Sequence, residues 1–244
     1  MKNKILVIVP SRSSGNGREK NVERFIEGWK SNTEGHSDLM IALDDDDQHY
    51  YPRVEGVLYD VNPRVRMIPT LNLVANKYIN DYEMIAFLGD DHFIRTPWES
   101  KFLEKHEQSN GFALCYGNDL FKGQWLPTAI CLSSKIVETL GYMVPEGLIH
   151  MYADNFWMDL GNSLKTLYYF NDVIFEHVHP DIGKTQRDNM YLESVEWMDP
   201  DRIKYEEYKS SGNFNKDVEK LNQVRLLCSS PKAIPRDKLI IQDH

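Results

Sequence analysis

The sequence predicts an α/β fold, with a mostly parallel central sheet flanked by helices and a helical tail at its C-terminal end. Short apolar runs bounded by glycine, proline or acidic residues recur through the first two thirds of the chain, and such runs are typical of strands buried on both faces of a parallel sheet. Between them, apolar residues recur at the spacing of amphipathic helices. From about residue 199 the chain is charged and helical in texture, without strong core periodicity.

The length of 244 residues fits one large domain with a small appendage. We expect residues 1–198 to form this domain, in a first half of residues 1–116 and a second half of residues 117–198. Residues 199–244 are expected to form a peripheral helical tail. The net charge of −9 excludes a general electrostatic attraction to nucleic acid or anionic membranes, although it leaves room for a local basic groove.

Nothing in the sequence indicates a membrane or an oxidising compartment. No apolar run approaches the roughly 20 residues that cross a bilayer. The start, MKNKILVIVP, is basic, but its apolar run is short for a signal peptide and no small-residue cleavage site follows. The three cysteines, Cys115, Cys131 and Cys228, form no C-x-x-C pair and so predict neither a disulfide framework nor a zinc site. We therefore expect a cytoplasmic protein with reduced thiols.

The first strand is predicted at residues 4–9, and Pro10 is expected to end it. The polar loop 11–18 follows, with two glycines and the arginines Arg12 and Arg18. Apolar residues then recur at helical spacing, at Val22, Phe25, Ile26 and Trp29. A strand, a glycine-containing loop and a helix in this order place backbone N–H groups and two guanidinium groups where a phosphate could bind. The loop is not a Walker A sequence, because no Gly-Lys-Ser/Thr follows it.

The second strand is predicted at residues 39–43, and the four acids Asp44–Asp47 follow it directly. Four adjacent carboxylates repel one another, so they are expected to be either solvated or paired. One of them could bind the base or ribose edge of a nucleotide at this strand end. Residues 65–68 predict a short third strand, and Thr70 is expected to begin a helix.

Residues 84–92, Met-Ile-Ala-Phe-Leu-Gly-Asp-Asp-His, predict the central strand and the polar cluster that follows it. In open α/β sheets ligands bind at the carboxyl ends of the strands, so Asp90, Asp91 and His92 stand where a ligand is expected. Carboxylate oxygens there suit Mg²⁺ or Mn²⁺, which proteins hold with one or two carboxylates and substrate phosphates. An ordinary acidic turn is the alternative interpretation.

After the central strand a helix is predicted to start at Thr96–Glu99, with Thr96 as N-cap and Glu99 three residues after it. Further apolar runs predict strands at 112–116, 126–132 and 166–178. Asp154 is expected at a helix N-terminus and Gly161 at the C-cap of that helix, and capping alone would explain an aspartate there. His177 and His179 end the last apolar run, and on a strand they would point to the same face.

Three places in the chain resemble the GT-A-fold glycosyltransferases of the family 2 group. The opening strand with Pro-Ser-Arg at residues 10–12 resembles their first nucleotide-binding loop. Residues 87–92 resemble the Asp-x-Asp metal motif, with a glycine where the first aspartate often stands. Residues 152–155 resemble the acidic acceptor-side motif, usually Glu-Asp, with Ala153 in the place of the glutamate. The resemblance covers about residues 4–190, and the order and spacing of the motifs carry it.

The resemblance implies a nucleotide-sugar donor, most often UDP-linked, and a divalent ion, Mn²⁺ or Mg²⁺, on its diphosphate. It implies that Asp91, with or without Asp90, holds the ion and that His177 or His179 completes the metal site. Asp154 would be the base that deprotonates the acceptor hydroxyl in an inverting displacement. The residues expected to bind the donor are Pro10, Ser11, Arg12, Arg18, Asp44, Asp45, Asn76, Asp90 and Lys184. On this interpretation residues 1–116 are the nucleotide-sugar-binding half and residues 117–198 the acceptor-side half.

The sequence leaves open the acceptor, which could be a glycan, a protein, a small molecule or a hydroxymethylated DNA base, as well as the oligomeric state. It also leaves two other functions open. A sugar-phosphate nucleotidyltransferase is suggested by Gly15-x-Gly17-Arg18, although the Ala-Ala-Gly lead-in and the later Pro-Lys pair of such enzymes are missing. A catalytically inactive sugar-binding module is the other, and the retained acidic and histidine clusters argue against it.

Overall fold

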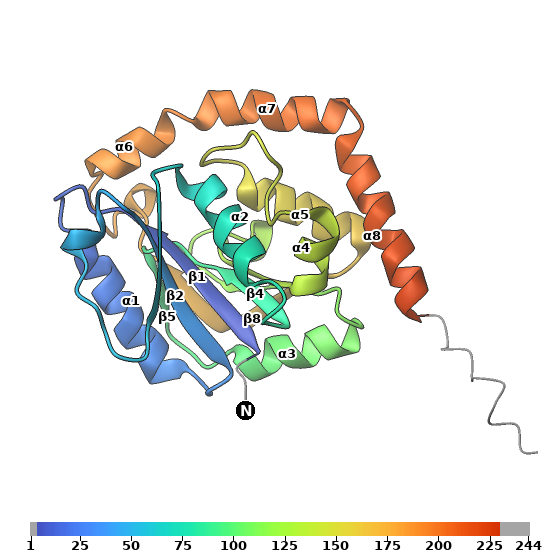
Figure 1. Ribbon diagram of the computed structural model, residues 1–244, viewed down its shortest axis with the longest axis horizontal. Coiled ribbons are helices and arrows are strands. Elements are labelled where there is room, and N and C mark those ends of the chain that lie inside the picture. The colour runs from blue at the N-terminus through green and yellow to red at the C-terminus, as the bar shows by residue number, and fades with distance from the viewer. Residues whose placement is uncertain (1–3, 230–244) are drawn as a thin grey trace, which may run out of the picture.

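A computed structural model describes residues 4–229, and these form one eight-stranded sheet with helices on both faces (Figure 1). The strand order is β3-β2-β1-β4-β7-β6-β8-β5. The strands are β1 (Ile5–Ser11), β2 (Ser37–Asp44), β3 (Leu58–Asn62), β4 (Met84–Phe87), β5 (His92–Ile94), β6 (Leu114–Asn118), β7 (Ile130–Ser133) and β8 (Leu167–His177). The helices are α1 (Glu19–Asn32), α2 (Met67–Tyr78), α3 (Glu99–Gln108), α4 (Ser134–Leu140), α5 (Ala153–Leu164), α6 (Asn189–Val195), α7 (Met198–Ser210) and α8 (Asn213–Ser229).

The predicted α/β class with a largely parallel sheet is confirmed. Strands β3, β2, β1 and β4 run parallel, so the carboxyl ends of β1, β2 and β4 meet at one edge of the sheet. Strand β7 runs antiparallel between β4 and β6, β8 runs parallel to β6, and the short β5 pairs antiparallel with β8. The last pairing places the residues that follow β4 beside the end of β8.

The core has two layers, one on each face of the sheet. In β1, Leu6 and Ile8 pack with residues of α2, α4 and α5, whereas Ile5, Val7 and Val9 pack with residues of α1 and α3. All five side chains are completely buried. A strand buried on both faces needs an unbroken apolar run, which is why β1, β2 and β4 are visible in the sequence.

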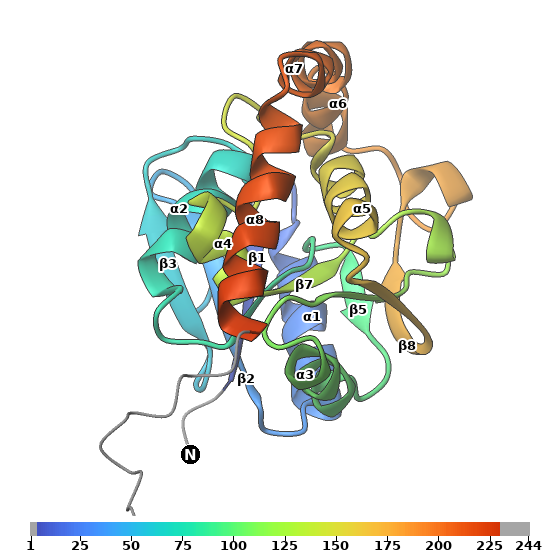
Figure 2. The same cartoon turned by 90° about the vertical axis from the view of Figure 1, so that its right-hand side faces the viewer.

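The helical tail is present, and its helices pack against the second half of the chain. Helices α6 and α7 cross one end of the molecule, and α8 then runs beside α4 and α5 (Figures 1 and 2). Tyr205 of α7 and Leu221 of α8 are buried in the same core layer as α5. Residues 230–244, which the sequence interpretation also assigned to the tail, lie outside the described residues. No helix within residues 4–229 is both long and apolar enough to cross a bilayer.

The prediction that Pro10 ends the first strand is wrong, because β1 continues to Ser11 and pairs Pro10 with Ala42 of β2. The other neighbour, β4, ends opposite Ile8, so β1 has one partner strand at Pro10. Proline lacks a backbone donor, and a position with a partner on one side tolerates that loss.

The third strand is not at residues 65–68 but at Leu58–Asn62, and α2 begins at Met67 rather than at Thr70. Strand β3 is an edge strand whose apolar residues Leu58 and Val61 are exposed, so it has no apolar run to reveal it. Of residues 65–68, Met67 and Ile68 instead form the start of α2, and Arg66 precedes the helix as its N-cap residue.

Helix α3 begins at Glu99, and the predicted capping box is absent. The Thr96 hydroxyl accepts a hydrogen bond from the backbone N–H of Ile174 (2.9 Å) and does not cap the helix. Gly161 likewise lies inside α5, where its Cα packs against Leu167, and Lys165 occupies the C-cap.

Candidate active site

A cavity of about 470 Å³ lies at the carboxyl ends of β1, β2 and β4. The loops after these strands line one side of it, and the N-terminal part of α5 lines another. Residues between His177 and Met198, a segment that includes α6, also line the cavity. Of the residues that the sequence assigned to the donor, those that line the cavity are Pro10, Ser11, Arg12, Arg18, Asp44 and Asp90.

Asp90 connects the end of β4 to the first loop. Its two oxygens accept hydrogen bonds from the Ser11 hydroxyl (2.6 Å) and the Arg18 guanidinium (2.7 Å). Burial raises the pKa of Asp90, and the positive charge of Arg18 works against that rise. The carboxylate therefore holds Arg18 at the cavity rather than leaving it in solvent.

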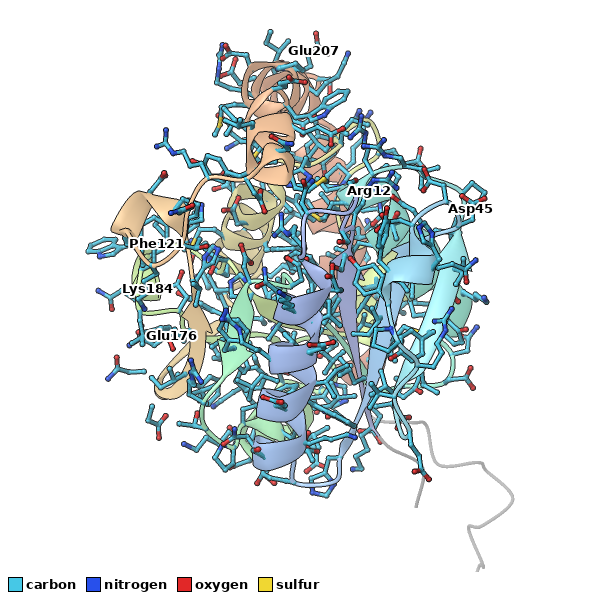
Figure 3. All side chains as sticks on the ribbon, turned by 90° about the vertical axis from the view of Figure 1, so that its left-hand side faces the viewer. Arg12, Asp45, Phe121, Glu176, Lys184 and Glu207 are labelled. Carbon is cyan, nitrogen blue, oxygen red and sulfur yellow. The ribbon has the colours of Figure 1, made fainter. Side chains whose placement is uncertain are left out.

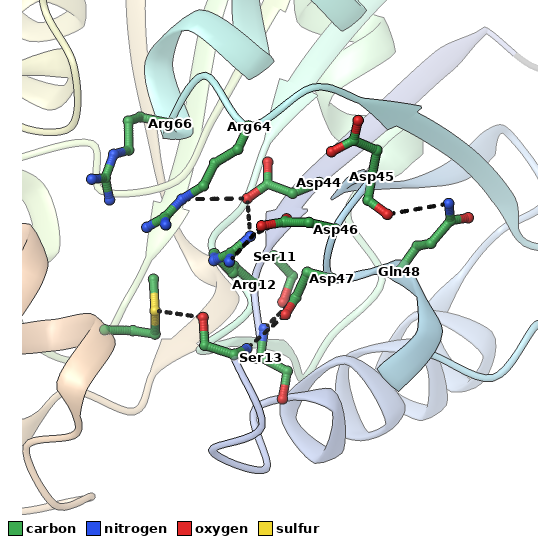
Figure 4. Close-up of polar contacts among 12 residues, drawn as sticks. Ser11, Arg12, Ser13, Asp44, Asp45, Asp46, Asp47, Gln48, Arg64 and Arg66 are labelled. Carbon is green, nitrogen blue, oxygen red and sulfur yellow. Dashed lines mark hydrogen bonds and ion pairs between the residues drawn. The ribbon is translucent and has the colours of Figure 1, made fainter.

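Three of the four acids Asp44–Asp47 at the end of β2 are paired, and Asp45 is exposed (Figure 4). Arg12 donates hydrogen bonds to Asp44 (2.8 Å) and Asp46 (2.6 Å), and Asp47 accepts the backbone N–H groups of Ser13 (2.6 Å) and Ser14 (2.8 Å). These contacts tie the loop after β1 to the loop after β2. Of the two carboxylates that hold Arg12, Asp44 lines the cavity and Asp46 does not.

Three residues assigned to the donor do not line the cavity. Asp45 is exposed and points away from Arg12 (Figure 4). Asn76 lies on the outer side of α2 and donates to the carbonyl of Gly141 (2.8 Å). Lys184 is paired with Glu176 (2.7 Å). In Figure 3 these two residues lie at the left of the molecule and Arg12 lies at the right.

Asp91, His92 and His177 form a group whose candidate ligand atoms all lie within 4.8 Å of one another. The antiparallel pairing of β5 with β8 puts His92 directly opposite His177, and their rings stack with centroids 4.0 Å apart. One oxygen of Asp91 lies 3.2 Å from His92 Nδ1, and the other lies 3.4 Å from His177 Nε2. A sequence pattern cannot reveal His92 as a candidate ligand, because its role depends on this strand pairing.

The group fits a divalent ion. His92 Nδ1 is buried and has no hydrogen-bond partner among residues 4–229, so no protein group competes with an ion for this atom. A Cβ atom at Gly89 would lie 2.7 Å from an Asp91 oxygen and 3.0 Å from His92 Nδ1, so glycine leaves these ligand atoms their space. One carboxylate and two imidazoles are ligands that Mn²⁺ accepts, whereas Mg²⁺ prefers oxygen alone.

The charges in this group are distributed unevenly. Burial opposes the charge of Asp91, but the imidazole of His177 holds the pKa of this carboxyl well below its usual range. Burial also works against the charge of His177, yet Asp119 and Asp91 raise the pKa of this imidazole to about 9. In contrast, burial lowers the pKa of His92.

His179 is not part of the three-residue group. Strand β8 ends at His177, so the two histidines do not share a strand face. The ring of His179 stacks on Phe121 with centroids 5.0 Å apart, and its Nδ1 accepts from the backbone N–H of Asp181 (3.2 Å).

Asp154 lies in the first turn of α5 and lines the cavity on the side away from the first loop. One of its oxygens accepts the backbone N–H of Asn155 (2.9 Å), and burial raises the pKa of its carboxyl. A carboxyl with a raised pKa in a cavity is a candidate for proton transfer. Nearby in the cavity lining, burial lowers the pKa of His150 to about 4, so this imidazole is neutral at physiological pH.

Replacing Gly89 with alanine is expected to weaken Mn²⁺ binding by about tenfold with little loss of fold stability. The backbone of Gly89 is not left-handed, and the atoms that the new methyl group would meet are the ends of side chains, which can move. Electron paramagnetic resonance of free Mn²⁺ would measure the affinity, and thermal unfolding in EDTA would measure the stability. An unchanged Mn²⁺ affinity would show that no ion binds between Asp91 and His92.

No protein-family model and no curated protein sequence matches the chain. Solved structures do match it. The crystal structure of S. aureus TarS, a glycosyltransferase, is 13% identical with a TM-score of 0.53, and the match covers 72% of this chain and 37% of that one. The structure of S. aureus TarS 1–349 in complex with UDP is also 13% identical with a TM-score of 0.53, and the match covers 70% of this chain and 59% of that one.

The chain thus spans less than two thirds of the length of these two structures. Identity at this level speaks for the fold and leaves activity open. The chain has a GT-A-like fold, which it shares with the TarS structures.

Proposed function

We propose that the protein is a metal-dependent glycosyltransferase that moves a sugar from a UDP-linked donor to an acceptor hydroxyl. One observation carries the proposal. A single cavity is lined by the arginines of the first loop, by the Asp91–His92–His177 group and by the half-buried Asp154. These are the three kinds of group that the reaction needs: cations for a diphosphate, ligands for a divalent ion and a base for a hydroxyl.

The donor side of the cavity is assigned to the first half of the chain, residues 1–116. Arg12 and Arg18 bind the diphosphate, since both guanidinium groups line the cavity and are held there by carboxylates. Asp44 contacts the nucleoside at the end of β2. The UDP bound to TarS 1–349 supports the choice of a uridine nucleotide.

Asp91, His92 and His177 hold the divalent ion, and the two imidazoles favour Mn²⁺ over Mg²⁺. When bound there, the ion stabilises the negative charge that the diphosphate gathers as it departs. Of the two histidines that the sequence offered as alternatives, this assignment takes His177 and not His179, and it adds His92 as a further imidazole ligand.

Asp154 acts as the base, on the acceptor side that residues 117–198 provide. It takes the proton of the acceptor hydroxyl while the oxygen attacks the anomeric carbon and the bond to the diphosphate breaks, with inversion. Its raised pKa favours this transfer, because a base works best when its pKa lies near the working pH. The acceptor is a glycan, a small molecule or a modified DNA base.

A panel of nucleotide-sugars, tested by thermal shift with Mn²⁺, Mg²⁺ or EDTA, examines this proposal. We expect one UDP-sugar to raise the melting temperature of the wild type with Mn²⁺, and to have no effect in EDTA or on Asp91→Ala. Asp172→Ala is the matched control, because this carboxylate is exposed on β8 and lies outside the cavity. If a UDP-sugar stabilises the protein equally in EDTA and in Asp91→Ala, the metal site is contradicted. If no nucleotide-sugar raises the melting temperature of the wild type, the proposed donor is contradicted.

A further inference from the structure

Asp119 is a buried carboxylate that neither the donor chemistry nor the acceptor chemistry uses. It follows β6 directly, is 2% exposed and does not line the cavity. Its Oδ1 accepts three backbone N–H groups, from Phe121 (2.9 Å), Lys122 (2.7 Å) and Gly123 (2.7 Å). Its Oδ2 accepts the hydroxyl of Thr128 (2.8 Å). One oxygen thus holds the loop, and the other is directed to the metal group.

The contact with Thr128 determines which nitrogen of His92 carries a hydrogen. A hydroxyl has one hydrogen, and Thr128 donates it to the ionised Asp119. The Thr128 oxygen can then only accept from His92 Nε2, which lies 3.3 Å away. A neutral imidazole has one N–H, so the hydrogen is on Nε2 and the lone pair is on Nδ1, the atom 3.2 Å from Asp91.

Asp119 also holds His177. Its backbone carbonyl accepts the N–H of His177 (2.9 Å), and its Oδ2 lies 3.9 Å from His177 Nδ1. The opposite ring nitrogen, Nε2, faces Asp91 at 3.4 Å. Each histidine therefore turns one nitrogen to the Asp119 side and the other to Asp91.

We propose that Asp119 is the positioning residue of the metal centre, which orients His177 directly and sets the tautomer of His92 through Thr128. Histidines that bind metals commonly donate their other ring N–H to a carboxylate or a carbonyl, and loss of that partner costs about 10–100-fold in metal affinity. Here one residue serves two histidines from different strands. Its carboxylate reaches His92 through Thr128, and its backbone carbonyl accepts the N–H of His177. This inference rests on the proposed function, because it assigns Asp91, His92 and His177 as the ligands.

Thr128→Val and Thr128→Ser form a matched pair for the test. Valine keeps the shape and removes the hydroxyl, whereas serine keeps the hydroxyl. Titration of Mn²⁺, followed by electron paramagnetic resonance, should give about 10–100-fold weaker binding for Thr128→Val and near wild-type binding for Thr128→Ser. Thermal unfolding in EDTA should remain cooperative for both variants, since the Asp119 contacts with the loop remain. Thr128→Val should melt at a lower temperature than Thr128→Ser, because Asp119 Oδ2 and His92 Nε2 lose a buried hydrogen bond.

Asp119→Asn gives a spectroscopic readout that a purely structural role would not move. The new amide would donate to the Thr128 oxygen, and the Thr128 hydroxyl would then donate to His92 Nε2. The hydrogen of His92 would move to Nδ1 and block that ligand atom. Nitrogen-15 NMR of the metal-free protein should report the Nε2–H tautomer of His92 in the wild type and the Nδ1–H tautomer in Asp119→Asn.

The outcomes separate this inference from the function on which it rests. If Asp91→Ala loses Mn²⁺ while Thr128→Val and Asp119→Asn bind it as the wild type does, the positioning role is overturned and the metal site remains. The same holds if the His92 tautomer does not change in Asp119→Asn. If Asp91→Ala binds Mn²⁺ as tightly as the wild type, the metal site itself is overturned, together with the proposed function.

Discussion

Replacing Asp154 with asparagine is expected to lower the rate of sugar transfer by about 10²–10⁴-fold and to leave donor affinity unchanged. Asparagine has the shape of aspartate but takes no proton. Its carbonyl oxygen can still accept the backbone N–H of Asn155, so the start of α5 is preserved. Burial raises the pKa of Asp154, so this carboxylate becomes protonated at a higher pH than an ordinary aspartate does. As the solution is acidified, the wild-type rate should therefore begin to fall at that higher pH.

The measurement is the release of UDP from the donor identified by thermal shift, together with calorimetric binding of UDP. Asp159→Asn is the control, because this carboxylate is on the same helix, pairs with Tyr205 and Lys209, and does not line the cavity. It should release UDP at the wild-type rate. Full activity of Asp154→Asn would remove Asp154 from the role of base.

Glu99→Ala is expected to lower the free energy of unfolding by about 3–5 kcal/mol. Glu99 is completely buried, and its carboxylate accepts the backbone N–H groups of Glu34 (3.0 Å) and His36 (2.8 Å). It also accepts the hydroxyls of Thr33 (2.8 Å) and Ser37. Alanine would leave these donors of the turn between α1 and β2 without their acceptor, and each buried unsatisfied group costs about 1–3 kcal/mol.

Denaturant unfolding would measure the change. Glu104→Ala on the same helix is the control, since this side chain is exposed and its partner, Gln108, is on the helix surface. Exposed substitutions of this kind usually change stability by no more than about 0.5 kcal/mol. A loss below about 1 kcal/mol in Glu99→Ala would mean that water replaces the carboxylate in this turn.

Local patterns predicted the elements that turn an apolar run or an apolar helix face to the core. Strand β4 and helix α1 follow directly from their apolar spacing, because their environment demands it. Strand β3 lies at the sheet edge, where its apolar residues Leu58 and Val61 are exposed and its buried residues Asp60 and Asn62 are polar, so its sequence looks like a loop. Glu99 was predicted to be part of a capping box, but its carboxylate instead accepts the backbone N–H groups of Glu34 and His36. These partners are more than 60 residues away in the chain, so a local pattern could not reveal them.

Some residues of the cavity could be predicted from their place at a strand end, whereas others depend on contacts between distant segments of the chain. Asp44 lies in the cavity lining and Asp45 outside it, because consecutive residues at a strand end point in opposite directions. His92 joins the metal group only through the pairing of β5 with β8, a contact between segments 85 residues apart. Asp119 acts through the same arrangement, and its sequence context is that of an ordinary turn after a strand.

Release of the nucleoside diphosphate from each nucleotide-sugar, by the wild type and by Asp91→Ala, tests the central claim most directly. We expect the wild type to release UDP from one UDP-sugar with Mn²⁺ present, and both EDTA and Asp91→Ala to abolish the release. The claim would be contradicted if every nucleotide-sugar remained intact while a nucleoside triphosphate and a sugar phosphate yielded pyrophosphate. That result would assign a nucleotidyltransferase instead.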